Sequence, residues 1–216
     1  MQVVAVFVLN KKKIHIIIVM LFIVILSNIS FGQSSFKTLS SPEKKWVLLH
    51  PFKAKKAQKI TFDVQLIVDS IRRSEIIGKD NNGGALDAFK HSFWMASLAI
   101  KIGKKQALKL GIAHEKANYL EFKKKQMEDA VLPDSLSSIM DLKNNETGVS
   151  LVNKNEPISK DQLVNKNLAA LAHGRLTIIK KDQKGNFIDC NGSLILMQEW
   201  MGKWNIPKCL APSFYH

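Results

Sequence analysis

Three short clusters of polar residues interrupt apolar stretches of the chain, and they contain the residue types best suited to chemistry. The first holds Asp87 and His91, which are four residues apart and therefore share one helix face with Trp94. A carboxylate and an imidazole beside a tryptophan are shielded from water, so they must be paired, bind a metal or exchange protons. The alternative is an ion pair that only joins two helices.

The second cluster is His114-Glu115, near the middle of the next apolar stretch. Adjacent helical residues point about 100° apart, so only one of the two can face the same site. The pair is not the H-E-x-x-H motif of metalloproteases, because position 118 is Asn.

The third cluster surrounds Asp141. On a helix, Asp141, Asn145 and Gly148 lie along one side, with Asn144 at its edge. Glycine costs about 1 kcal/mol in a helix, so we expect a neighbouring backbone or a ligand to approach Gly148 closely. The alternative is that Asn144-Asn145 ends the helix.

Carboxylate, imidazole and amide groups from three successive helices can meet inside a helical bundle and form a polar or metal site. A divalent metal such as Zn, Mn or Fe would suit these ligand types, and its predicted ligands are Asp87, His91, His114 and Asp141. Glu115 is predicted to take a proton from metal-bound water, and Asn145 to orient the substrate. The residues expected to support the substrate or the structure are Trp94, Asn144 and Gly148. A hydrogen-bonded core network would use the same residue types.

Taken in order, the clusters resemble a bacterial family of unknown function whose motifs are D-A-F-R-H-x-x-W, A-H-E and M-D-x-x-N-N-x-x-G. The chain has D-A-F-K-H-S-F-W at 87–94, A-H-E at 113–115 and M-D-L-K-N-N-E-T-G at 140–148. Lys90 stands where the family has Arg. The resemblance covers about residues 46–176 and implies an α-helical domain with a shared polar site. It also implies a context of secreted proteins and large toxin-like proteins, but no established activity.

Apolar periodicity predicts a mainly α, compact, bundle-like domain. Ser41 and Ser159 are typical N-caps, and Gly103 is a typical C-cap. Helices are expected to begin near 41, 52, 85, 104, 135 and 159, with a last one over 194–204. The segments 176–181 and 186–190, joined through 182–185, predict one small β-hairpin near the C-terminus.

The N-terminus has the pattern of an export signal. Lys11–Lys13 precede the apolar run Ile16–Leu26, and small and polar residues follow. Eleven residues span only about 17 Å as a helix, short of the roughly 30 Å bilayer core. We therefore predict a signal peptide over 1–32, a leader over 33–41 and one domain over 42–216; the alternative is an uncleaved anchor.

Composition limits the class of protein further. The 216 residues are 46% apolar and carry a net charge of +14, and removal of 1–32 takes away three lysines and no acid, which leaves +11. This content excludes a disordered or collagen-like chain. An anionic substrate or surface is a plausible partner, but the lysines are scattered without interleaved aromatic residues, so no nucleic-acid motif is present. Cys190 and Cys209 favour a disulfide over two buried thiols.

These observations together predict an exported α-helical protein of uncharacterised type, with no transmembrane segment in the mature chain. The activity they favour is that of a metal-dependent hydrolase of phosphoesters or other anionic substrates. One alternative is a non-enzymatic envelope or secreted module whose Asp/His/Asn cluster is structural. A second is an antibacterial effector-like domain. No Ser or Cys nucleophile motif is evident in the sequence.

Overall fold

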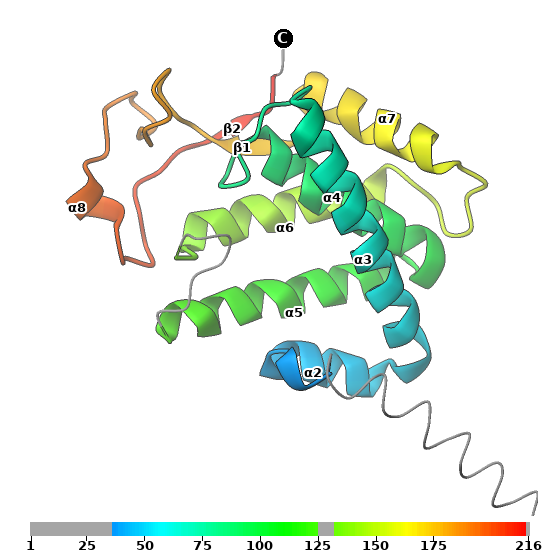
Figure 1. The fold of residues 1–216 in the computed structure, drawn as a ribbon. Coiled ribbons are helices and arrows are strands. Elements are labelled where there is room, and N and C mark those ends of the chain that lie inside the picture. The colour runs from blue at the N-terminus through cyan, green and yellow to red at the C-terminus, as the bar shows by residue number, and fades with distance from the viewer. Residues whose placement is uncertain (1–35, 125–131, 215–216) are drawn as a thin grey trace, which may run out of the picture. The chain divides into compact units, whose positions relative to one another are not determined.

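The computed structural model describes residues 36–124 and 132–214, and it is mainly helical, as the sequence predicts (Figure 1). The predicted signal peptide, 1–32, lies outside the described residues. The elements in chain order are α2 (Ser41–Leu49), α3 (Pro51–Ser74), α4 (Ala85–Ile102), α5 (Lys104–Lys123), α6 (Ser135–Ser150), α7 (Lys160–Ala172), β1 (Thr177–Ile179), α8 (Met197–Trp200) and β2 (Leu210–Pro212).

Local signals set the ends of several helices. The α4 helix stops at Gly103, whose φ of 89° favours glycine. The α6 helix starts after Asp134, whose side chain accepts hydrogen bonds from the backbone amides of Leu136 and Ser137. The α7 helix starts at a capping box between Ser159 and Gln162. The predicted caps Gly103 and Ser159 are therefore confirmed.

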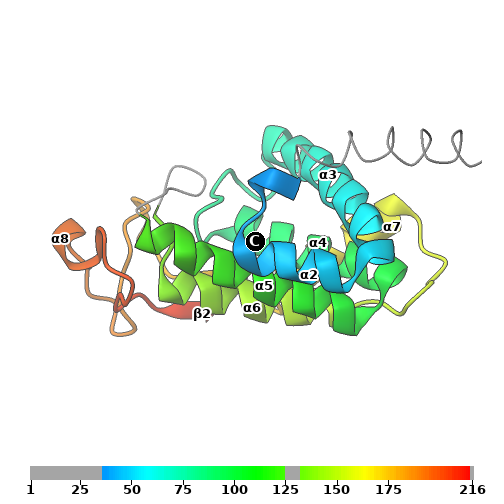
Figure 2. The ribbon, with the colours of Figure 1, turned by 90° about the horizontal axis from the view of Figure 1, so that it is seen from below.

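The core forms around α4, which contacts α3, α5, α6 and α7. The α4 helix is apolar on most of its surface, as expected for a helix that neighbours surround. Its fully buried side chains include Leu86, Phe89, Phe93 and Met95. These contacts belong to one unit that runs from Ser41 to His216, and Figure 2 shows α5 and α6 side by side within it.

A small antiparallel sheet near the C-terminus is confirmed, and β1 lies within the predicted strand 176–181, but its partner is β2 and not the predicted strand 186–190. Strand β1 pairs with β2, with Ile178 opposite Ala211. Within the predicted hairpin, Lys181 and Phe187 form only an isolated bridge. The predicted disulfide between Cys190 and Cys209 is also confirmed, and it joins the segment just before β2 to the end of the predicted hairpin. A partner distant in sequence has therefore replaced the local one.

The last predicted helix, 194–204, is wrong in its extent, since only Met197–Trp200 is helical. Its large apolar side chains Leu194, Leu196, Met197 and Met201 are exposed. Helical spacing stabilises a helix mainly when the apolar face packs against another surface, and these side chains lack such burial. Among the described residues, no helix is both long and apolar enough to cross a bilayer.

Candidate metal centre

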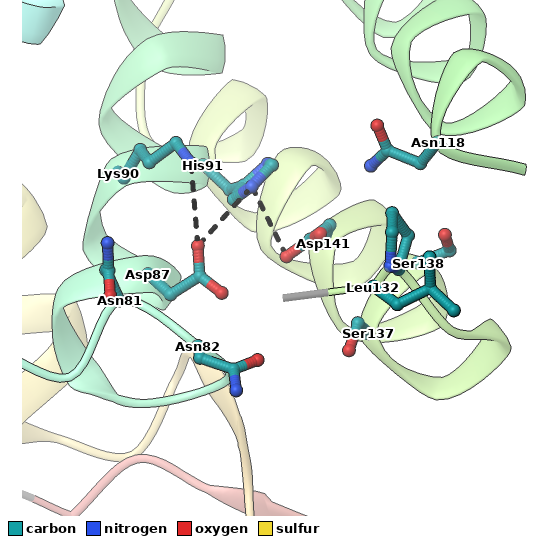
Figure 3. A pocket seen from close by; sticks show the side chains of 11 residues that line it. Asn81, Asn82, Asp87, Lys90, His91, Asn118, Leu132, Ser137, Ser138 and Asp141 are labelled. Atoms are coloured by element: carbon teal, nitrogen blue, oxygen red, sulfur yellow. Dashed lines mark ion pairs between the residues drawn. The ribbon is translucent and has the colours of Figure 1, made fainter. Parts of the chain in front are cut away.

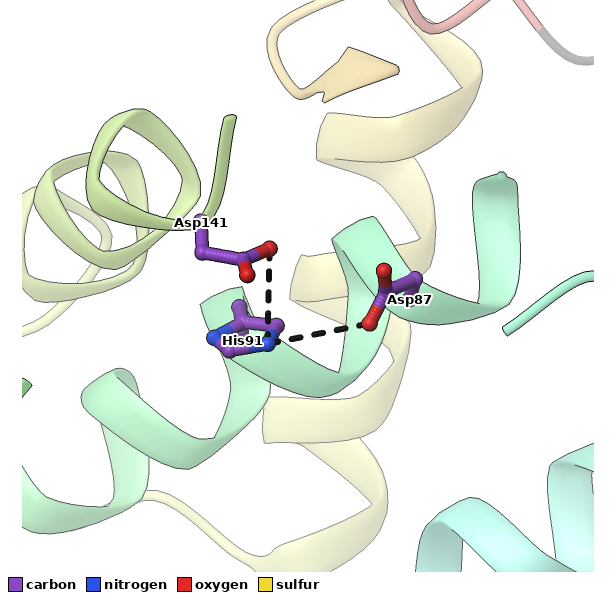
Figure 4. Close-up of side chains that lie close together, drawn as sticks. All are labelled: Asp87, His91 and Asp141. Carbon is purple, nitrogen blue, oxygen red and sulfur yellow. Dashed lines mark ion pairs between the residues drawn. The ribbon is translucent and has the colours of Figure 1, made fainter. Parts of the chain in front are cut away.

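Two carboxylates and one imidazole meet between α4 and α6 (Figures 3 and 4). Asp87 and His91 lie one turn apart on α4, and Asp141 faces them from α6. His91 Nε2 is 3.6 Å from Asp87 Oδ1 and 3.4 Å from Asp141 Oδ1. All three residues are buried, and one ligand atom from each lies within 4.8 Å of the others. The first and third sequence clusters therefore converge.

The close crossing of α4 and α6 places Asp141 beside His91. At Gly148, a Cβ would overlap the backbone carbonyl of Ser92, the residue after His91. Gly148 follows Asp141 by two helical turns and lies on the same face. The prediction that a backbone approaches Gly148 is confirmed, and α6 continues past Asn144-Asn145 to Ser150 rather than ending there.

Asp87 is held by its own loop and helix. The backbone N–H of Gly83 donates to Asp87 Oδ2 at 2.9 Å, and Lys90 Nζ lies 3.8 Å from Asp87 Oδ1. Gly83 has a φ of 79°, and Ile179 of β1 fills the space that a Cβ would need. This contact fixes the loop, so one oxygen of Asp87 stays directed at His91.

His91 is electrically neutral near pH 7. Burial lowers its pKa well below the ordinary 6.5, since a charged imidazolium loses its hydration there. The charges of Lys90 and His114 lower the pKa further, while the nearby Asn145 amide acts in the opposite direction. A neutral imidazole offers a lone pair, which is the form that binds metals.

The distances fit an ion shell better than hydrogen bonds. Hydrogen bonds from N–H to oxygen fall at about 2.7–3.2 Å, whereas the two His91 distances are 3.4 and 3.6 Å. A tetrahedral ion with bonds of about 2.0–2.1 Å separates neighbouring ligand atoms by about 3.4 Å. The two distances from His91 therefore match the spacing of ligands around one small cation, and the carboxylate oxygens of Asp87 and Asp141 lie within 4.8 Å of each other.

A pocket of about 40 Å³ opens beside these residues (Figure 3). One ordered water needs roughly 10–15 Å³ of such space, so the pocket accommodates an ion or a small group with a few waters. Most of the residues that line it are polar, and they come from the loop before α4, from α4, α5 and α6, and from Leu132 and Pro133 just before α6. Besides the three ligand candidates, it includes Asn81, Asn82, Lys90, Asn118, Ser137 and Ser138.

His114 lies next to this cluster but outside it. Its ring is centred 6.3 Å from that of His91, and its Nδ1 lies 3.3 Å from Glu43 Oε1 on α2. Trp94 packs edge-on against the His114 ring at 5.4 Å, and its Nε1 donates to Thr61 Oγ1. The structure thus places His114 in an α2–α5 contact and Trp94 in an α3–α4 contact.

Glu115 is buried one residue further along α5. It accepts a hydrogen bond of 3.1 Å from Asn118 Nδ2, and Asn118 lines the pocket whereas Glu115 does not. Glu115, the predicted proton acceptor, therefore does not contact the pocket itself and acts there only by orienting the Asn118 amide.

The two adjacent asparagines of α6 have different surroundings. Asn144 is fully buried and pairs with β1, donating to Thr177 O at 2.9 Å and accepting from Thr177 N at 2.8 Å. The Asn144 amide pairs with the backbone N–H and C=O of Thr177 as a neighbouring strand would, so its role is structural. Asn145 is buried towards α5 against Gly111, and neither of its amide atoms makes a hydrogen bond of standard geometry with any described residue.

Several pocket residues escaped sequence analysis. Asn81 and Asn82 read only as part of a turn before Gly83, and nothing local marks Ser137 as a wall of the site. Asn118 carried a weak signal, since it lies one turn after His114 and three residues after Glu115. Glu43, the partner of His114, is 71 residues away in sequence, and no spacing rule links the two.

The chain belongs to the family described only as a domain of unknown function, DUF6973, whose match covers residues 44–175. The matched range holds α3 to α7, residues 44–49 of α2, and every residue of the candidate metal centre. No curated protein and no solved structure matches the chain.

Proposed function

We propose that this protein is an exported metal-dependent hydrolase of phosphoesters or similar anionic substrates, with the ion held by Asp87, His91 and Asp141. One observation carries the proposal: three buried potential ligand atoms, from two helices, lie within 4.8 Å of one another. The two buried carboxylates carry two negative charges, of which Lys90, 3.8 Å from Asp87, can offset one, and a bound cation would stabilise the pair further.

The ligand set favours a first-row metal. One imidazole nitrogen and two carboxylate oxygens suit Zn, Mn or Fe, while Mg and Ca prefer oxygen alone. Three protein ligands would leave positions for water and substrate. Such an ion lowers the pKa of a bound water so that it can act as a nucleophile at neutral pH.

The pocket walls support an anionic substrate. Lys90 brings a positive charge to the pocket, and Asn81 and Asn82 bring side-chain amides that can donate hydrogen bonds to oxyanions. Asn118, oriented by Glu115, adds a further amide. The net charge of +11 on residues 33–216 favours the approach of an anion.

Export is supported by two independent features. The sequence of 1–32 has the order of regions of a signal peptide. The Cys190–Cys209 disulfide is the kind of bond that persists in oxidising compartments and is rare in the cytosol. Intact mass of the protein from the exported fraction tests this part: a start near Gln33 is expected, and a full-length chain would contradict it.

The metal and the activity are tested together. Protein purified without chelators is analysed for metal content, then assayed on bis(p-nitrophenyl) phosphate before and after EDTA treatment and metal readdition. We expect about one ion per chain, and hydrolysis that EDTA removes and metal restores. Asp141→Asn and His91→Gln should lose both ion and activity. The matched controls Asp161→Asn and His173→Gln, at exposed sites on or just after α7, should keep both.

The outcomes separate the alternatives. Protein that binds no ion, whether as purified or with added Zn, Mn or Fe, would make the cluster structural, as in a non-enzymatic secreted module. If the protein binds an ion but hydrolyses none of a panel of phosphoesters, the proposed metal centre stands and the proposed hydrolase activity is wrong.

A further inference from the structure

The α3 helix has two apolar faces, and only one of them is buried. Ala57, Val64, Val68 and Ile71 pack inward, chiefly against α4. On the opposite side, Phe52, Phe62 and Leu66 are 92, 64 and 53% exposed. Their spacing of ten and four residues puts all three on one side of the helix. Exposed apolar side chains aligned in this way indicate an interaction surface.

Lysines are interleaved with these apolar side chains on α3, which corrects the expectation from the sequence that no aromatic residues lie among the lysines. Lys55 and Lys59 lie between Phe52 and Phe62 on the same face, and both are exposed. We call this row, Phe52, Lys55, Lys59, Phe62 and Leu66, the α3 stripe. Leu48 and Leu49, at the end of α2, are also exposed beside its start.

The surrounding segment is strongly basic. Residues 44–62 contain six lysines and no aspartate or glutamate. Two copies of the stripe meeting in a symmetric dimer would bring these lysines against each other, which disfavours self-association. The partner must therefore be anionic and also accept protruding phenylalanine and leucine side chains.

We propose that the α3 stripe binds the surface of an anionic lipid bilayer. A convex helix face with Phe and Leu side chains can insert shallowly at the boundary between headgroups and acyl chains, while lysines reach the anionic headgroups. A nucleic acid would match the lysines but not Leu48, Leu49 and Leu66. The face lies on α3, whereas the metal centre lies on α4 and α6, so the two can be tested separately.

Binding is measured by co-sedimentation of residues 33–216, which retain the whole unit from Ser41 onward and lack the apolar run Ile16–Leu26. The vesicles contain either phosphatidylcholine alone or phosphatidylcholine with 30% phosphatidylglycerol. We expect binding only to the anionic vesicles, decreasing as salt increases because surface charges are screened.

Two variants separate the apolar and basic contributions. Phe52→Ser with Phe62→Ser, and Lys55→Glu with Lys59→Glu, should each weaken binding about tenfold or more. The controls are Leu194→Ser with Met197→Ser, which also removes two exposed apolar side chains, and Lys143→Glu with Lys184→Glu, which makes the same charge change at exposed sites elsewhere. Circular dichroism should be unchanged in all four, since the altered side chains are exposed.

Absence of binding to anionic vesicles at low salt would overturn the proposal. So would an equal loss in the lysine controls, because binding would then follow net charge alone. A dimer in sedimentation velocity that only the Phe52→Ser, Phe62→Ser variant abolishes would identify a second copy as the occupant and would also overturn it.

Discussion

Gly148 of α6 lies so close to Ser92 of α4 that a Cβ would overlap the Ser92 carbonyl oxygen. This contact sets the separation of the two helices that carry His91 and Asp141. The 3.4 Å distance between His91 Nε2 and Asp141 Oδ1 thus depends on a glycine two turns away from the aspartate.

Gly148→Ala should therefore destabilise the fold and disturb the site. Overpacking of this kind costs about 1–3 kcal/mol, and α6 must move outward, which carries Asp141 away from His91. Urea denaturation and metal affinity measure the two effects. Ser150→Ala, at an exposed site on the same helix, is the control; similar small changes in both variants would contradict the prediction.

Adjacent asparagines should respond differently to truncation. Asn144→Ala removes two hydrogen bonds to Thr177 and leaves partly buried backbone groups of β1 without them, a loss of about 2–3 kcal/mol. Asn145→Ala removes an amide that makes no standard hydrogen bond with the described residues, so its cost is smaller. Thermal unfolding compares them, and equal losses would show that Asn145 is as structural as Asn144.

The stability of metal-free protein should fall below pH 6.5. Burial lowers the pKa of His91 in the folded state, so the unfolded chain binds the proton first as the pH decreases. The stability that comes from a neutral His91 is therefore fully present above the ordinary histidine pKa of 6.5. It is lost as the pH falls towards the lowered pKa of the folded state, at up to about 1.4 kcal/mol per pH unit. Urea denaturation in EDTA between pH 7.5 and 5 measures this slope. His91→Gln should flatten it and His173→Gln should not.

Lys208 and Asp134 form a buried ion pair of 2.6 Å between the C-terminal segment and the start of α6. The Lys208 ammonium also lies 3.7 Å from the centre of the Phe187 ring. Lys208→Met should cost about 3 kcal/mol, because Asp134 would remain buried without this countercharge. Lys203→Met, five residues earlier and exposed, is the control. Equal denaturation midpoints for the two variants would exclude a structural role for the pair.

Reduction of the disulfide should destabilise the unit. Cys190 and Cys209 are 19 residues apart, and opening a loop of this size costs about 3 kcal/mol in the chain-entropy description. Urea denaturation with and without dithiothreitol gives the difference. The double variant Cys190→Ser, Cys209→Ser should be less stable than the oxidised protein and should not respond to the reductant.

Local sequence determined the helices from α2 to α7 and much of the site. The spacing of Asp87 and His91 placed both on one face of α4, Gly103 and Ser159 marked helix ends, and Gly148 indicated a close helix contact. Each of these features depends on interactions within one or two turns or on a property of one residue. The sequence therefore sufficed for them.

Only the tertiary structure decided which residues meet. It placed Asp141 within reach of His91 and paired His114 with Glu43, and it joined β1 to β2 instead of to its neighbour in sequence. Helical periodicity gives the direction of a side chain relative to its own axis, but not the rotation and separation of two packed helices. Those follow from which side chains interdigitate and where a glycine permits close approach.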